Sequence, residues 1–283
     1  TGWLFVAALV LFLIDTLAGL WARAGGRQVR ASATAALMVA LLAGTALPVM
    51  ADEKYVLENN LETRLAYLQT GNARVDDTSL RGLIGLTTML ARRTAAELGT
   101  PQGVEPGIND LAFFPLIYWP VTPDYELDDV SALAVKEYLK NGGTILFDTQ
   151  DRGGGAQAQA LREIAVRLDL PPLVPVEAGH VLTRSFYLMD SFPGRYAGAS
   201  IWVERAGERV NDGVSPVVAG SNDWASAWAM DEAQRPMYPV VPGGERQREL
   251  AFRFGINMVM YVLTGNYKAD QVHLPAIMKR LGQ

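Results

Sequence analysis

The residues best suited to bind a ligand stand directly after an apolar run, Thr144–Phe147. In an open α/β sheet, ligands bind where the carboxyl end of a strand leads into a glycine-rich loop and a helix N-terminus. Glycine lets backbone N–H groups approach an anion, and an arginine beside it adds positive charge. The loop matches neither the dinucleotide fingerprint nor the P-loop, so a mobile surface loop without a ligand is the alternative. The candidate ligand-binding residues of this loop are Asp148, Asp151, Arg152, Gly153 and Gly154.

A second group of polar residues follows another strand candidate, Ser215–Ala219. This group, Asn222, Asp223 and Trp224, would face the same edge of the sheet as Asp148 if the two strands run parallel. Asp223 could instead cap a turn, and Trp224 could simply belong to the core. We therefore add these three residues to the candidate ligand-binding site.

Composition and motif spacing exclude several kinds of catalytic or metal site. The chain has no cysteine, so it lacks a cysteine nucleophile, a thiolate metal site and disulfide bonds. Its two histidines, His180 and His273, have no acidic partner at the spacing of a helical zinc site. The nearest serine string, Gly213-Val-Ser-Pro-Val, lacks the last glycine of a nucleophile elbow. We expect no metal, no cofactor and no catalytic residue, and we keep His180 and Arg184 as candidate ligand-binding residues.

The elements that must position these residues follow from the apolar periodicity. Short apolar runs predict strands at 63–69, 111–119, 144–147 and 215–219. Spacings of three and four predict a first helix that starts at caps within 77–79 and stops at Gly99. Two more helices are expected at 126–140 and 156–168. The helix at 126–140 is indicated by the apolar residues Val130, Leu133, Ala134 and Leu139.

The remaining chain completes one α/β domain. Short apolar stretches and turns between 173 and 209 predict hairpins or loops. A final helix is expected at 246–263, and Gly265 is expected to end it. Its buried stripe is predicted to consist of Leu250, Phe254, Met258 and Val262. The alternation of helices and strands predicts an open, mostly parallel sheet with helices on both faces.

Two apolar runs precede this domain, at residues 2–21 and 31–51. Each is close to the about 20 residues with which a helix crosses a bilayer. The loop between them carries three arginines and no acidic residue, so the positive-inside rule places it in the cytoplasm. We expect residues 1–51 to be a membrane anchor and residues 52–283 to be exported, into the periplasm of a Gram-negative bacterium. A cleaved signal peptide at 23–51 is the alternative, and it delivers the domain to the same side.

The exported part is acidic. Without the first 51 residues, the chain has 22 basic and 29 acidic residues, which predicts no nucleic-acid-binding face. The arginine pair Arg92-Arg93 and the arginines of 246–253 stand beside glutamates, which is typical of paired surface charge. Because the chain begins with Thr1 rather than methionine, we expect it to be the C-terminal part of a longer protein.

Six motifs are spread over residues 52–283. They are Thr63-Arg-Leu-Ala-Tyr-Leu, Tyr118-Trp-Pro, Gly142-Gly-Thr-Ile-Leu-Phe-Asp-Thr, Leu182-Thr-Arg-Ser-Phe-Tyr-Leu with Phe192-Pro-Gly-Arg, Gly220-Ser-Asn-Asp-Trp-Ala, and Gly265-Asn-Tyr-Lys-Ala-Asp. Together they resemble a bacterial family known only as domain of unknown function 4159. The resemblance implies a fold similar to class I glutamine amidotransferases, which is flavodoxin-like. It also implies a place at the C-terminus of inner-membrane proteins with an aerotolerance-regulator-like N-terminal part, in a membrane complex linked to a MoxR-type ATPase. It implies no reaction.

Two functional hypotheses follow. Amidotransferases of that fold need a cysteine nucleophile, so this activity is excluded. The leading hypothesis is a non-enzymatic, membrane-anchored domain that binds a partner protein or a small ligand. The alternative is a hydrolase or transferase that uses Asp148, Asp223 and His180. Convergence of these residues and Arg152 within hydrogen-bonding reach in one cleft would favour the enzyme, and strand ends covered by aromatic packing would favour the binding module.

Overall fold

A computed structural model describes residues 62–151, 154–205 and 215–281 of the chain, with side chains up to Thr264. The apolar runs at 2–21 and 31–51, expected to be membrane spans, lie outside these residues. Within the described ranges, no helix combines the length and the apolar character needed to span a bilayer.

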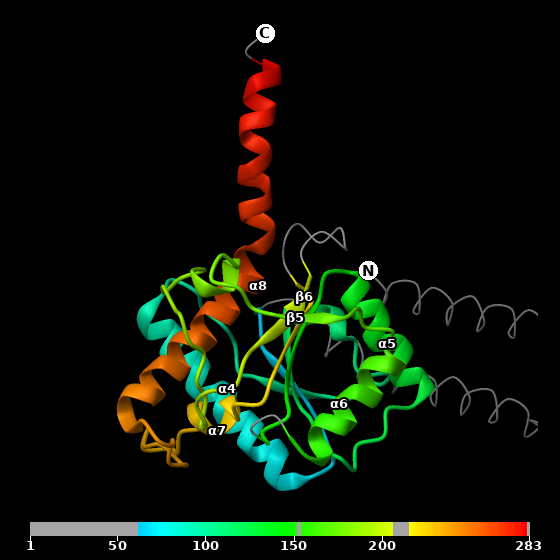
Figure 1. The fold of residues 1–283 in the computed structure, drawn as a ribbon, viewed down its shortest axis with the longest axis vertical. Coiled ribbons are helices and arrows are strands. Elements are labelled where there is room, and N and C mark those ends of the chain that lie inside the picture. Colours follow the sequence, from blue (N-terminus) through cyan, green and yellow to red (C-terminus); the bar gives the residue numbers. More distant parts are fainter. Residues whose placement is uncertain (1–61, 152–153, 206–214, 282–283) are drawn as a thin grey trace, which may run out of the picture. The chain divides into compact units, whose positions relative to one another are not determined.

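The fold is an α/β fold built on one mixed, mostly parallel sheet of seven strands (Figure 1). Across the sheet the order is β2-β1-β3-β4-β7-β6-β5. The first five strands in this order are mutually parallel, and β6 runs antiparallel to both of its neighbours. The strands are β1 Ala66–Leu68, β2 Gln102–Val104, β3 Leu116–Pro120, β4 Thr144–Asp148, β5 Leu173–Pro175, β6 Trp202–Glu204 and β7 Val217–Gly220.

Helices cover both faces of the sheet, as the sequence predicts. Figure 1 shows α5 and α6 on one side, and α4, α7 and the first part of α8 on the other. Within residues 62–151, 154–205 and 215–281, the α-helices are α4 Ala73–Arg93, α5 Asp129–Lys140, α6 Ala156–Arg167, α7 Trp224–Trp228 and α8 Gly244–Leu281. The short 3₁₀ helices η1 Leu111–Phe113 and η2 Val181–Thr183 lie in the connections.

The alternation of side chains along the central strands explains why both faces are covered. Leu116 and Tyr118 of β3 point into the core under α4, α7 and α8. Trp119, the next residue of the same strand, points to the opposite face. There its ring lies 5.0 Å from that of Phe147. Because successive strand residues face opposite sides, a strand buried on both faces must be apolar throughout, as β3 and β4 nearly are.

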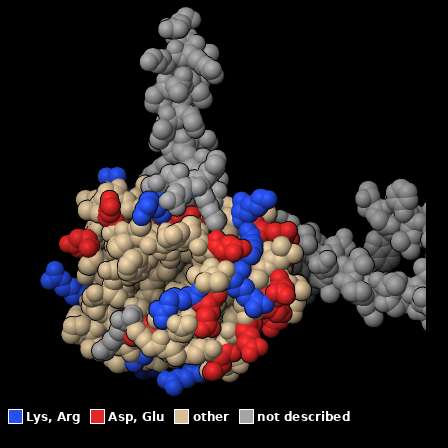
Figure 2. Space-filling model, turned by 45° about the vertical axis from the view of Figure 1, so that its right-hand side comes forward, with Lys and Arg blue, Asp and Glu red and all other residues tan. Residues whose placement is uncertain are grey.

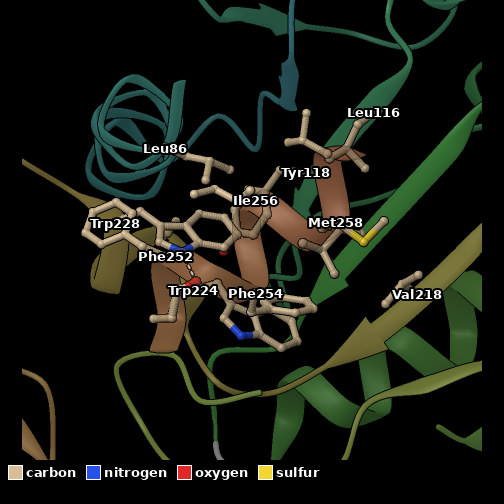
Figure 3. Packing of buried hydrophobic residues seen from close by; sticks show 14 of the residues in the cluster. Leu86, Leu116, Tyr118, Val218, Trp224, Trp228, Phe252, Phe254, Ile256 and Met258 are labelled. Carbon is tan, nitrogen blue, oxygen red and sulfur yellow. Dashed lines mark hydrogen bonds between the residues drawn. The ribbon is translucent and has the colours of Figure 1, made fainter. Parts of the chain in front are cut away.

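Aromatic side chains from α7 and α8 fill the larger core (Figure 3). Phe254 is fully buried, and its ring centroid lies 4.7 Å from that of Trp224 and 6.4 Å from that of Trp228. The indole N–H of Trp228 donates to the carbonyl oxygen of Ala251 at 2.8 Å, so this buried polar group is paired. Five-residue α7 is therefore held by packing against α8 rather than by its own length.

Close backbone contact between α4 and α7 depends on glycine. A Cβ atom added at Gly85 of α4 would lie 2.0 Å from the carbonyl oxygen of Trp228, and one added at Gly82 would lie 2.6 Å from that of Ala225. Any side chain at these two positions would push α7 away from α4.

Several predicted boundaries are wrong. Helix α4 starts at Ala73 and not within 77–79, because Asn72 caps it by accepting hydrogen bonds from the Arg74 and Val75 N–H groups. It ends at Arg93, so Gly99 does not terminate it. The run predicted as a strand at 111–119 divides into η1 and β3 on either side of Pro115, because proline cannot donate to the sheet. Strand β2 and helix α7 were not predicted.

The buried faces of α5 and α8 do not follow simply from the apolar pattern. On α5, Val130 and Leu133 are 66% and 59% exposed, and the helix buries Ala132, Val135, Tyr138 and Leu139. On α8, Phe254 and Met258 are fully buried as predicted, but Leu250 and Val262 are only half-buried. Helix α8 also continues through Gly265. Apolar residues occur on several sides of both helices, so periodicity alone does not select the buried side.

Candidate functional site

Asp148 lies at the carboxyl end of β4 and is completely buried. One carboxylate oxygen, Oδ1, accepts hydrogen bonds from the backbone N–H groups of Gln150 and Asp223, both at 3.1 Å. The other, Oδ2, accepts from the Trp224 backbone N–H at 2.7 Å and from the Tyr118 hydroxyl at 2.9 Å. Both oxygens are thus occupied by protein donors.

These contacts make Asp148 the N-terminal cap of helix α7, a role that the sequence did not reveal. Helix α7 has no side-chain cap of its own; instead Asp148, from a neighbouring strand, accepts the N–H groups at its start. Burial, followed by the nearby Asp223 carboxylate, raises the pKa of Asp148 to about 7, against the opposing effect of its hydrogen bonds. Strand pairing brings Asp148 close to the start of α7, since Asp148 of β4 pairs with Gly220 of β7, and α7 begins shortly after Gly220 in the chain.

Asp223 joins Asp148 at this edge, as predicted. Its backbone is left-handed, with φ of 53°, a conformation that aspartate tolerates better than most residues. Its carboxylate lies 3.4 Å from the guanidinium of Arg195. Burial raises the pKa of Asp223, and the hydrogen bonds that its carboxylate accepts from Ser226 and the charge of Arg195 oppose this rise. Arg195 also lies 5.4 Å from the ring centroids of Tyr196 and Tyr238.

Asn222 and Trp224 are both fully buried and hold the segment 190–201 in place. The Asn222 amide donates to the carbonyl oxygens of Phe192 at 3.1 Å and Ala199 at 3.4 Å. The indole N–H of Trp224 donates to the same Phe192 oxygen at 3.2 Å. These two side chains therefore fix the backbone of a loop that has no regular secondary structure of its own.

That loop forms one wall of a cavity of about 500 Å³. The cavity lies at the carboxyl edge of the sheet, because Ile201, which lines it, immediately precedes β6, and the start of β6 pairs with the end of β7. The first turn of α8 forms the facing wall. The lining residues are Val176, Asp190, Ser191, Phe192, Pro193, Ala197, Gly198, Ala199, Ser200, Ile201, Pro242, Gly243, Arg246, Gln247 and Leu250.

Gln247 ties the two walls together and is itself buried. Its amide nitrogen lies 2.9 to 3.0 Å from the carbonyl oxygens of Gly194, Arg195 and Val241. Its amide oxygen accepts the Gly243 N–H at 2.9 Å. The sequence interpretation missed Gln247 and the other residues of α8 in this cavity, because nothing in the periodicity shows that 190–201 and 242–250 meet.

His180 does not join the aspartates. Its Nδ1 accepts the Leu182 backbone N–H at 3.2 Å, and its ring centroid lies 5.7 Å from that of Tyr261. The Tyr261 hydroxyl accepts the N–H of Ser215, which precedes β7, so His180 lies toward the amino edge of the sheet. Burial lowers the pKa of His180. Arg184 is exposed beside it and donates to the Gly179 carbonyl oxygen at 2.9 Å.

The glycine-rich loop after β4 is described only in part. Arg152 and Gly153 lie outside the described residues. Asp151 is half-buried and accepts a hydrogen bond from the Thr149 hydroxyl at 2.6 Å, while Gly154 is exposed.

The second histidine, His273, lies on α8, beyond the residues whose side chains are described.

The charges of the described surface are mixed. Basic and acidic side chains are interspersed on the face in Figure 2, without a continuous basic area. The predicted pairing of arginines with glutamates is confirmed at Glu249, which binds Arg93 at 2.8 Å and Arg253 at 2.8 Å. In residues 62–151, 154–205 and 215–264, no three acidic or histidine side chains gather in a way that would hold a metal ion.

Comparison with known proteins agrees with the resemblance seen in the sequence. Residues 64–263 match the family model described as Domain of unknown function (DUF4159). The chain belongs to this family. A search of curated proteins gives no match, and the family description assigns no activity.

Proposed function

We propose that this DUF4159 domain is a non-catalytic binding module, exported and anchored in the bacterial inner membrane, whose cavity at the carboxyl edge of the sheet takes a ligand or a segment of a partner protein. The proposed location rests on the sequence. The loop between the two apolar runs is basic, so the positive-inside rule puts this loop in the cytoplasm and the following domain outside it. The binding role rests on the described site.

The observation that carries the binding role is the closure of the carboxyl edge around Asp148. A general acid or base must reach the proton that it transfers, but four donors surround this carboxylate and none of its surface is exposed. Asp223 is engaged with Arg195, and His180 lies toward the opposite edge. Among the side chains that the structure describes, the aspartates therefore have no imidazole partner, which favours binding over hydrolysis or group transfer.

The cavity beside this closed edge has the character of a binding pocket. Its volume falls within the range of about 300 to 1000 Å³ that is common for ligand sites, and its walls are mainly apolar with a few polar groups. The resemblance to amidotransferase-like folds supports an α/β scaffold retained without its cysteine. Family context, rather than the site, supports a membrane complex linked to a MoxR-type ATPase.

Native mass spectrometry of the full chain, purified from membranes in mild detergent, tests the binding role. We expect a co-purifying ligand or partner that is lost when Ser200→Trp fills the exposed mouth of the cavity. The matched control is Val166→Trp, which places the same indole on the exposed face of α6. Equal occupancy in the wild type and both variants would refute binding in this cavity.

The proposed location has its own test. Reporter fusions placed after Ala51 should be active only outside the cytoplasm. Fusions active only in the cytoplasm would refute export without bearing on the cavity.

A further inference from the structure

The mouth of the cavity carries two charged side chains of opposite sign. Asp190 and Arg246 both line it and both are exposed. Neither makes an ion pair within the described part of the chain, unlike Arg248, Glu249 and Arg253 on the same helix as Arg246. The cavity thus offers an acceptor for a cation and a donor for an anion.

Much of the remaining lining is apolar. Phe192, Pro193 and Ile201 come from one wall, and Leu250 comes from α8 on the other. The hydroxyls of Ser191 and Ser200 add short polar contacts. An uncharged ligand would leave both charges without a partner, and a ligand with a single charge would leave one of them without a partner, whereas a ligand with both charges pairs with each.

The walls are fixed by buried side chains before any ligand arrives. Asn222 and Trp224 bind the backbone of 192–199, and Gln247 joins this segment to the start of α8. A preformed cavity loses less conformational entropy on binding than a flexible one. A ligand can therefore be recognised by its two charges as well as by its apolar body.

We propose that the cavity binds a short apolar peptide with free ends, its ammonium group at Asp190 and its carboxylate at Arg246. This inference rests on the proposed binding function and adds the ligand class. A peptide of two or three residues suits the cavity better than a single amino acid, because about 500 Å³ is in the range that accommodates drug-sized ligands. Its amide groups can also reach the two serine hydroxyls.

Calorimetric titration of the full chain with trileucine tests the proposal. The peptide is used in four forms: with free ends, N-acetylated, C-amidated and blocked at both ends. Acetylation removes the positive charge and amidation removes the negative charge, while the leucine side chains stay the same. Because a hydrogen bond to a charged group is among the stronger polar contacts, each block should weaken binding about tenfold or more.

Two variants assign each end of the peptide to its residue. Asp190→Asn should bind the free and the N-acetylated peptide equally, and Arg246→Gln should bind the free and the C-amidated peptide equally. Each variant should keep its discrimination at the other end. Thermal unfolding checks that the variants fold; if either does not, the four peptide forms on the wild type still decide.

The proposal is overturned if the doubly blocked peptide binds as tightly as the free one, or if trileucine does not bind at millimolar concentration. Failure of the ligand class is separable from failure of the cavity. If another molecule co-purifies with the wild type and is displaced by Ser200→Trp, the binding module stands and only the peptide proposal is wrong. If trileucine does not bind and no co-purifying molecule is lost from Ser200→Trp, both proposals fail.

Discussion

Replacing Asp148 by asparagine should destabilise the domain, although the two side chains have nearly the same shape. The asparagine NH₂ group can only donate, whereas both oxygens of the wild-type carboxyl group can accept a hydrogen bond, including the one that carries the proton when the group is neutral. If the new NH₂ takes the position of Oδ2, the Tyr118 hydroxyl can turn and accept, but the Trp224 N–H loses its acceptor at 2.7 Å. If the NH₂ takes the position of Oδ1, both Gln150 and Asp223 N–H groups lose theirs.

The first orientation costs less, so the expected loss is that of one buried, unpaired N–H, about 1 to 3 kcal/mol. For a domain of this size, this corresponds to a decrease in thermal midpoint of about 2 to 10 °C. The comparison is cleanest at pH 5, where the carboxyl group of Asp148, with its pKa of about 7, is largely protonated and the two side chains are both neutral.

The loss should shrink as the pH rises from about 4 through about 7. The folded-state pKa of Asp148 lies above the value near 4 of an unfolded aspartate, so protonation stabilises the fold. This stabilisation is complete below about pH 4 and is lost as the pH rises through about 7. The asparagine variant lacks this titration, so the wild type loses its advantage at alkaline pH.

Thermal unfolding of the wild type, Asp148→Asn and the control Asp124→Asn at pH 5 and pH 8 measures this effect. Asp124 is an exposed aspartate on the loop after β3, and its replacement should change stability by less than about 0.5 kcal/mol. An unchanged midpoint for Asp148→Asn at pH 5, or a loss that grows toward pH 8, would contradict the structural role that the hydrogen bonds assign to this residue.

Three further predictions concern the core and the helix contacts. Phe254→Ala should cost about 3 to 5 kcal/mol in urea unfolding, because the ring is fully buried between Trp224 and Trp228; a cost below about 1 kcal/mol would contradict this packing. Gly85→Ala should destabilise by about 1 to 3 kcal/mol, since its Cβ would meet the Trp228 carbonyl oxygen, whereas Gly179→Ala, with open space around it, should be nearly neutral. Gln247→Leu should lower the thermal midpoint and weaken ligand binding together, because its amide joins both cavity walls; unchanged binding would show that the walls stay in place without it.

The class of fold and the order of its central elements are determined by the sequence alone. Apolar runs such as Thr144–Phe147, followed by a polar residue and a helix, require a strand buried on both faces, because no other local structure satisfies that pattern so well. The meeting of Asp148 and Asp223 at one edge followed from the same reasoning and is confirmed. Element ends were less well predicted, since caps such as Asn72 compete with equally suitable residues nearby.

Only the tertiary structure decided what these residues do. The donors to the Asp148 carboxylate include Tyr118 and Trp224, which are 30 and 76 positions away in the chain, so no local pattern distinguishes a buried cap from a ligand-binding carboxylate. Val130 and Leu133 are apolar yet exposed, because the sheet packs against another side of α5. The cavity exists only because 190–201 and the start of α8 meet in space. Burial and pairing are properties of such distant contacts, whereas periodicity records only the neighbours along the chain.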